Sequence, residues 1–233
     1  MDEKIAKKIL DETIGQIFRY QNPLSLEQAM LQFAFDVRLP QQVYDVKTNQ
    51  PTWTASMGQN RYATMQGMQK MIEGDGNMRP ARNLTNLQDV LGAWNEINFT
   101  STDRQIGSKN VAESDGVYHS DGVYRSVDIR KSNNILFSDG VDGCDHVVAG
   151  QTSKRCNFVV RVEDSKDIVN SFNIIWSSKI ANSMFIQDCY DLDECLFCSN
   201  IAGKRFCIAN MQYEEAEYRR IKDIVARWVL QSA

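Results

Sequence analysis

The sequence predicts an α+β fold with an N-terminal, mainly α-helical region, a narrow parallel β-solenoid of about twelve residues per coil, and a C-terminal capping helix. Three observations predict it. Apolar residues recur at helical spacing near both ends of the chain. Between them, SDGVYHSDGVYRS (114–126) opens a six-residue repeat. From Ser108 to Ile201, every third residue is Ser, Cys, Gly, Val, Ile or Leu. We therefore place the three regions at 1–105, 106–212 and 213–233.

The start of the chain favours two helices. Apolar residues recur at helical spacing over 5–18, and the pair Asn22-Pro23 ends that helix. Ser25 then begins a Ser-x-x-Gln capping box with Gln28, which predicts a second helix that closes before Pro40.

The next segment mixes strand and helix signals. Residues 43–56 alternate weakly around a turn at Asn49-Gln50-Pro51, which indicates a hairpin. A helix is predicted over 61–72 and broken by Gly74–Asn77, and another begins after Thr85 with an apolar face that includes Trp94.

The every-third pattern of 108–201 excludes the two ordinary elements. In an α-helix, residues three apart drift around the surface, and a regular strand buries every second residue. A flattened coil of about twelve residues can point one residue in three into a thin core, and each position then stacks on itself about 4.8 Å further along the axis. The segment supplies close to eight such coils.

Two local features of the pattern predict turns. Asp, Asn and Gly precede the aliphatic positions, as at Gly116 and Asn134, and these residue types suit tight corners. The hexads are interrupted once, at Val162–Asp164, which exchanges the small and large tracks. We interpret this interruption as a bulge or a short loop at a corner.

The pattern also gives a list of residues that should face the interior. Inward serines are expected to hydrogen-bond their counterparts in the next coil or nearby backbone carbonyls. The predicted solenoid core is Ser114, Val117, Ser120, Val123, Ser126, Ile129, Ser132, Ile135, Ser138, Val141, Cys144, Val147, Cys156, Val159, Ser165, Ile168, Ser171, Ile174, Ser177, Ile180, Ser183, Ile186, Cys189, Leu192, Cys195, Cys198 and Ile201.

The cysteines allow two interpretations. Cys189, Cys195, Cys198 and Cys207 have a spacing that four zinc-bound thiolates could use. All six cysteines of the chain, however, fall on the every-third track with the serines and valines. We favour small core residues over a metal site, with one stacked disulfide as a minor alternative.

Composition disfavours several classes of function. A net charge of -4 and a pI near 5.3 argue against a nucleic-acid-binding surface. The sequence has no apolar run of membrane-spanning length and no secretory signal, so we expect a protein that folds in a cytoplasm. The two histidines, His119 and His146, leave little material for histidine-based catalysis. We expect neither an enzyme nor a cofactor.

The end of the chain resembles a known group. A Lys-x-aromatic-Cys-Ile-x-Asn-x-Gln-Tyr phrase follows the Ser/Cys hexads and leads into an acidic helix, as it does in loosely characterised proteins of tailed phages and phage-like bacterial contigs. The helix reads Glu-Glu-Ala-Glu-Tyr here instead of the usual Lys-Glu-Glu-Tyr. The matching positions are Lys204, Phe206, Cys207, Ile208, Asn210, Gln212, Tyr213, Glu215 and Tyr218.

The resemblance implies a structural component of a virion, assembled in the host cytoplasm, with other virion proteins and further copies of itself as partners. The helical region would then dock and the solenoid would act as a spacer. The alternative is a module that binds glycan or protein through outward aromatic residues. The residues of that possible stripe are Tyr118, Tyr124, Phe172, Trp176 and Tyr190. An acyltransferase-type hexapeptide solenoid is disfavoured, because its inward positions are unevenly spaced.

Overall fold

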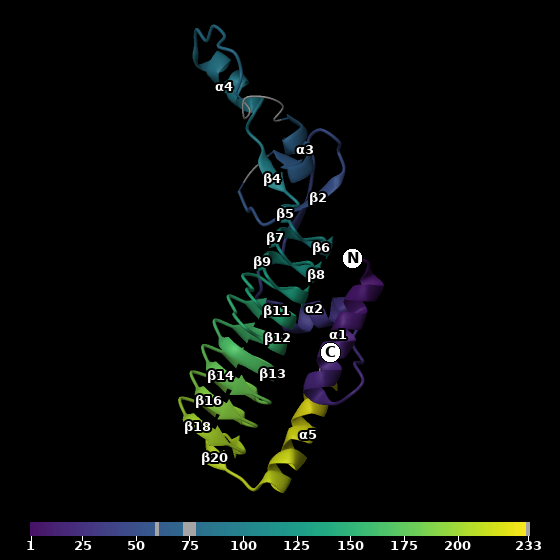
Figure 1. Ribbon diagram of the computed structural model, residues 1–233, viewed down its shortest axis with the longest axis vertical. Coiled ribbons are helices and arrows are strands. Elements are labelled where there is room, and N and C mark those ends of the chain that lie inside the picture. The colour runs from purple at the N-terminus through teal and green to yellow at the C-terminus, as the bar shows by residue number, and fades with distance from the viewer. Residues whose placement is uncertain (59–60, 72–77, 232–233) are drawn as a thin grey trace.

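The expected fold class is confirmed. In a computed structural model that describes residues 1–58, 61–71 and 78–231, the helical N-terminal region precedes a parallel β-solenoid of about 9 turns with ~12 residues per coil, and a helix closes the chain. Figure 1 shows an elongated molecule with helices α1 and α5 along one side of the solenoid and α4 at the far tip. At about 4.8 Å per turn, the solenoid is about 43 Å long.

The N-terminal region contains helices and short strands. Its elements are α1 (Glu3–Phe18), α2 (Leu26–Phe33), β1 (Gln41–Tyr44), β2 (Pro51–Thr54), β3 (Tyr62–Thr64), α3 (Met65–Met71), α4 (Leu87–Asn95) and β4 (Thr100–Thr102). The capping box of Ser25 and Gln28 starts α2 as predicted. Strands β1 and β2 form the predicted antiparallel hairpin.

The helix predicted over 61–72 is shorter than expected. Its first residues form β3, which pairs in parallel with β4, and α3 begins only at Met65. The carboxylate of Asp45 accepts the backbone N–H of Thr64 at 2.8 Å, and the Thr64 hydroxyl accepts that of Gly67 at 3.0 Å. These side chains therefore fix where the strand ends and the helix starts. The predicted break at Gly74–Asn77 lies outside the described residues.

The solenoid strands stack with a shift of one coil. They are β5 (Gln105–Ile106), β6 (Lys109–Ala112), β7 (Asp115–Tyr118), β8 (Asp121–Tyr124), β9 (Val127–Arg130), β10 (Asn133–Leu136), β11 (Asp145–Gln151), β12 (Asn157–Glu163), β13 (Lys166–Ile175), β14 (Ser178–Ala181), β15 (Met184–Gln187), β16 (Tyr190–Asp193), β17 (Leu196–Ser199) and β18 (Ala202–Arg205). Each residue pairs with its counterpart in the next coil, as Ile135 does with Val147 and Val147 with Val159.

The backbone repeats with the same period of three. Every third residue from Gly107 to Ala209, the one just before each inward residue, has a positive φ. In most coils the chain bends where the next residue is an inward serine, as after His119, and the strand continues where it is aliphatic, as after Gly122. The exceptions are Ser171, which lies inside β13, and Val141 and Ile201, which follow bends. The expectation that Asp, Asn and Gly before aliphatic residues mark corners is wrong for Gly116 and Asn134, which lie inside β7 and β10, because most bends lie at the small residues.

Serine hydroxyls continue the hydrogen-bond ladder at these bends. Ser126 Oγ donates to the carbonyl of Tyr124 at 2.9 Å and accepts the backbone N–H of Ser138 at 3.0 Å. Thiols take the same place, since Cys144 Sγ accepts the N–H of Cys156 at 3.1 Å. The predicted bonding of inward serines to neighbouring coils and carbonyls is thus confirmed.

The interruption at Val162–Asp164 is neither a bulge nor a loop. Strand β12 runs through it to Glu163, and Val162 pairs with Gly150 on one side and Ile174 on the other. The small and large tracks exchange because Gly150 leaves space: a Cβ there would lie 2.6 Å from Val147 Cγ1. The coil length is kept and only the inward side chains change.

One outward ladder is apolar along the whole solenoid, and the helices cover it. Helix α1 packs against β8 and β10–β13, and Arg161 of β12 pairs with Asp36 just after α2 at 2.8 Å. We call these residues the apolar outer ladder: Ala112, Tyr124, Leu136, Val148, Val160, Phe172, Met184, Leu196 and Ile208. A second core therefore lies outside the solenoid, between this face and the helices.

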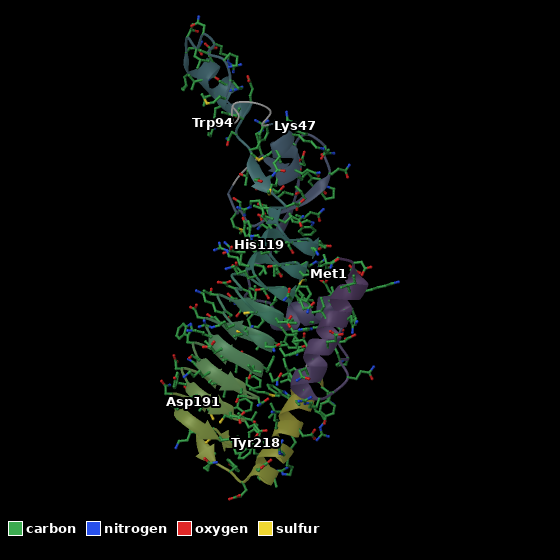
Figure 2. The ribbon with its side chains drawn as sticks, in the orientation of Figure 1. Met1, Lys47, Trp94, His119, Asp191 and Tyr218 are labelled. Atoms are coloured by element: carbon green, nitrogen blue, oxygen red, sulfur yellow. The ribbon has the colours of Figure 1, made fainter. Side chains whose placement is uncertain are left out.

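The two ends of the solenoid are closed differently. At the first coil, buried Asp115 accepts bonds from Arg104 and from the backbone N–H of Ala55, which follows β2. At the last coil, β19 (Cys207–Ile208) turns back into β20 (Met211–Gln212) as an antiparallel pair. Helix α5 (Glu215–Gln231) then runs back along the solenoid, with Tyr218 buried against Phe206 (Figure 2).

Candidate functional site

The aromatic residues of the possible binding stripe lie on different faces. Tyr124 and Phe172 belong to the apolar outer ladder and are buried under the helices. The Phe172 ring lies 5.3 Å from that of Phe18 in α1 and 5.7 Å from that of Phe33 in α2. These two aromatics hold the helices on the solenoid and are not available to a ligand.

The other three aromatics lie away from the helices. Tyr118 and Tyr190 share one outward ladder, where they are separated by several coils, and Arg130 covers Tyr118 at 5.9 Å from its ring centroid. Trp176 occupies a neighbouring ladder. Trp176 is 57% exposed and Tyr190 is 49% exposed. Only Trp176 and Tyr190 come together.

A shallow groove of about 690 Å³ connects these two rings. Its floor is a corner of the solenoid made by Ser177 and Cys189, where the small residues lie after the tracks exchange. Polar side chains from the two flanking ladders complete the lining, namely Asp164, Lys166, Ser178 and Asp188. Sequence reasoning missed these four, although writing the sequence in twelves places them beside Trp176 and Tyr190.

The cysteines lie where the track predicted them, inside the solenoid. All six are buried, free thiols. Burial raises the pKa of both Cys189 and Cys207. Within the described ranges, no group of three or more Cys, His, Asp or Glu residues is arranged to hold a metal ion. The predicted core residues are all buried except Ile201, which is partly exposed.

The two histidines have separate environments. His119 is exposed at a corner near the first coils (Figure 2). His146 stacks on Phe158, with ring centroids 4.3 Å apart, and its Nε2 lies 3.5 Å from a carboxylate oxygen of Glu12 in α1. The structure thus does not bring the two histidines into one site.

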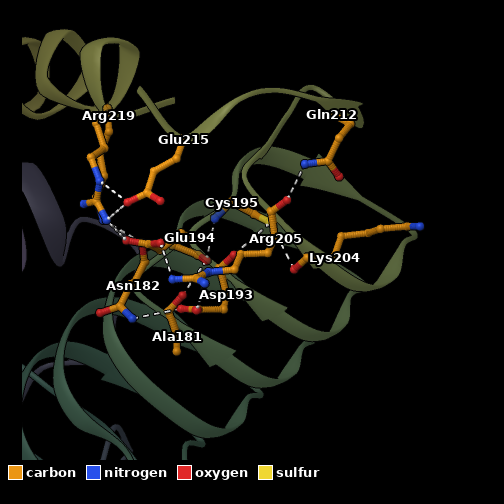
Figure 3. Close-up of polar contacts among 12 residues, drawn as sticks. Ala181, Asn182, Asp193, Glu194, Cys195, Lys204, Arg205, Gln212, Glu215 and Arg219 are labelled. Atoms are coloured by element: carbon orange, nitrogen blue, oxygen red, sulfur yellow. Dashed lines mark hydrogen bonds and ion pairs between the residues drawn. The ribbon is translucent and has the colours of Figure 1, made fainter. Parts of the chain in front are cut away.

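A buried carboxylate anchors α5 on the last coils. Glu194 is 8% exposed and accepts from Arg205 at 3.0 Å, while Arg219 of α5 lies 3.4 Å away on its other side (Figure 3). Asp193 pairs with Arg205 as well, and Glu215 with Arg219. Each charged group of this network has an oppositely charged partner within it, which identifies it as a structural junction.

A cavity of about 400 Å³ lies beside this junction, between α1, α5 and the solenoid. Lys222 donates to the carbonyl of Asn182 at 2.7 Å, and burial lowers the pKa of this lysine. Tyr20, two residues after the end of α1, donates to Asp223 of α5 across the same space. The contacts that we observe here join the two helices to each other and to the coils.

Helix α4 has an uncovered apolar face at the tip of the molecule. None of its residues is buried. Its exposed apolar side chains are Leu87 (67% exposed), Val90 (46%), Leu91 (42%) and Trp94 (53%) (Figure 2). Charges next to this face are paired within the tip, since Glu96 binds both Arg79 and Arg82.

Comparison with known proteins gives no further information on the site. No family model, no curated protein and no solved structure matches this chain. In the part of the chain that the structure describes, no helix is both long and apolar enough to cross a membrane.

Proposed function

We propose that this protein is a non-enzymatic structural component of a tailed-phage virion, associated with its head, neck or tail. The solenoid serves as a rigid spacer and the tip that carries α4 serves as the docking end. The resemblance of the stretch from Lys204 to Tyr218 to phage-encoded proteins supports the assignment to a particle. The spacer and docking roles rest on one observation: the solenoid is continuous, and an apolar helix face lies at one end of the molecule.

The spacer role is supported by how the coils are connected. Backbone pairing is parallel and continues along the axis through both halves, and serine and cysteine side chains carry it across the corners. Helix α1 spans several coils, so separating those coils would also expose the second core. Bending the rod therefore disturbs two cores at once, which favours stiffness.

The docking role is supported by the uncovered face of α4. Apolar patches of this kind mark protein interaction sites. Because the charges of Arg79, Arg82 and Glu96 are already paired, the partner does not have to supply complementary charge. We propose that the occupant is an uncharged apolar surface of a neighbouring virion protein. The expected self-association of this chain would then use other surfaces.

Mass spectrometry of purified particles tests this function. We expect the wild-type chain in the particles at a fixed ratio to the major capsid protein. Trp94→Glu should reduce its incorporation about tenfold, because it places a charge in the centre of the docking face. Ile224→Glu, at an exposed apolar residue of α5, is the matched control and should be incorporated normally. Particles that lack the wild-type chain would contradict the proposal.

A further inference from the structure

We propose that the groove between Trp176 and Tyr190 binds a neutral oligosaccharide. This binding activity does not depend on the proposed place of the protein in a particle. The groove lies on a face that the helices leave uncovered, and its lining combines two exposed aromatic rings with two carboxylates, a hydroxyl and an ammonium group.

Trp176 is an exception on its own ladder. Successive residues of this ladder are one coil apart, and all eight have positive φ: Gly116, Asp128, Gly140, Thr152, Asp164, Trp176, Asp188 and Asn200. Trp176 is the one bulky side chain among them. Its φ of 47° is in the left-handed region, which bulky side chains disfavour. With 57% of its surface exposed, the ring recovers little of this strain by packing. Because positive φ recurs at every third residue of the coils, the backbone alone does not set Trp176 apart. What does is a large ring left exposed on a ladder that otherwise carries Gly, Asp, Asn and Thr, and this favours a functional explanation.

The polar groups of the groove are available to a ligand. Elsewhere on the same two ladders, Asp128 and Arg130 form an ion pair at 2.9 Å. Asp164 and Lys166 occupy the equivalent positions, yet among the described residues neither they nor Asp188 forms a side-chain hydrogen bond or ion pair. Their charges are therefore not committed within the protein, in contrast to the matched junction at Glu194.

These groups select a class of ligand. Sugar rings present apolar C–H faces that pack on aromatic rings, and their hydroxyls both donate to carboxylates and accept from ammonium groups. With Asp164 and Asp188 against Lys166, the lining carries an excess of negative charge, which disfavours sulfated or phosphorylated chains. The groove is open and shallow, so it suits a chain lying across the surface rather than an enclosed small molecule. A neutral oligosaccharide fits all three conditions.

The position of Tyr190 supports the same assignment. Lys179 Nζ lies 5.0 Å from the centroid of the Tyr190 ring, a contact that restrains the ring. Because Trp176 and Tyr190 come from neighbouring ladders in adjacent coils of the solenoid, their spacing does not have to be organised when the ligand binds. A restrained pair of rings is what a weakly interacting sugar needs.

A glycan array printed with neutral, sialylated and sulfated glycans tests the proposal on the full chain, followed by calorimetric titration with maltoheptaose, cellohexaose and chitohexaose. Hexalysine serves as a cationic peptide probe. We expect binding to at least one neutral glycan series and no binding to hexalysine or to sulfated glycans. Tyr190→Ala should weaken the binding at least about tenfold.

Trp176→Asn separates binding from folding. Asparagine occupies the same ladder at Asn200 with positive φ, so this variant should melt no lower than the wild type while losing at least about tenfold in affinity. Trp94→Ala, at an exposed tryptophan of α4, is the control and should bind like the wild type. Absence of neutral-glycan binding, binding that survives Trp176→Asn, or selective binding of hexalysine or sulfated glycans would each overturn the proposal.

Discussion

At the scale of single residues, the corners of the solenoid depend on small side chains that can both donate and accept. A serine hydroxyl bonds the carbonyl two residues earlier and receives an N–H from the next coil, as Ser126 does. A thiol does the same with weaker bonds, which explains why cysteines and serines share the track. Size and hydrogen bonding therefore select these residues together.

Ser126→Ala tests this role. The change leaves the N–H of Ser138 without an acceptor in a buried corner, while the carbonyl of Tyr124 keeps the N–H of Phe137. The free energy of unfolding should therefore fall by about 1–3 kcal/mol. Ser126→Cys keeps a donor and an acceptor and should lose less. Chemical denaturation of the three proteins measures the difference. Equal stability of the alanine variant and the wild type would show that the hydroxyl ladder contributes nothing.

Asp45 makes the stability of the N-terminal region depend on pH. Burial pushes its pKa up, but the backbone N–H groups of Thr64, Thr48 and Lys47 donate to the carboxylate and together hold the pKa below its usual value. A lowered folded pKa stabilises the protein above the unfolded value of about 3.9, and this stabilisation is lost as the pH falls through the folded pKa.

Asp45→Asn should therefore destabilise the protein at pH 7, and the difference from the wild type should shrink as the pH falls below about 4. Thermal melting across this range measures it. Asp191→Asn, at an exposed residue of the solenoid, is the control and should give a pH profile parallel to that of the wild type. A constant difference between Asp45→Asn and wild type would refute the role of the carboxylate.

At the scale of elements, the solenoid and its helices share an interface that the sequence pattern reveals only in part. The every-third rule predicts the inner core, because a thin cross-section tolerates only small and branched side chains at those positions. It does not separate Phe172 from Trp176, since both face outward. The twelve-residue register places Phe172 on the apolar outer ladder and Trp176 on an uncovered one. That register follows from the predicted coil of about twelve residues, but the sequence does not show which outward ladder the helices cover.

The prediction of a bulge or a short loop at Val162–Asp164 was also wrong. Three extra residues usually indicate a bulge, but here the backbone repeat is itself three residues long. Adding one three-residue repeat therefore changes which inward side chains are large, but it does not disturb the strand pairing at Val162. The apolar face of α1 predicts a helix with one buried side. Amphipathicity does not show which surface that side packs against, so the position of α1 along the coils could not be predicted.

Ile174→Asp tests the cooperativity of the coils. The change buries a carboxylate in the fully enclosed inner core and should remove about 4 kcal/mol or more of local stability. Since each coil supports only its neighbours, the coils after β12 should open first. Hydrogen exchange should show lost protection over 166–208 and retained protection over 109–136. Wild-type melting of this variant would contradict the inward assignment.

At the scale of the whole molecule, the chain forms a stiff body with an apolar helix at one end. The solenoid ends are closed, by the cap around Asp115 at the first coil and by β19 and β20 at the last, so unpaired strand edges are protected from uncontrolled stacking. Helices α1 and α5 meet along one side through Tyr20 and Asp223. The apolar face at the α4 tip lies outside this closed body, and we propose that it is the contact point in a larger assembly.

A high-resolution reconstruction of the tailed-phage particle that we propose contains this chain tests the central claim most directly. The account predicts rod-shaped density about 43 Å long with a repeat of about 4.8 Å, and a neighbouring virion protein in contact with Leu87, Leu91 and Trp94 of α4. A particle without this rod, or one in which the rod is present and the α4 face points into solvent, would contradict it.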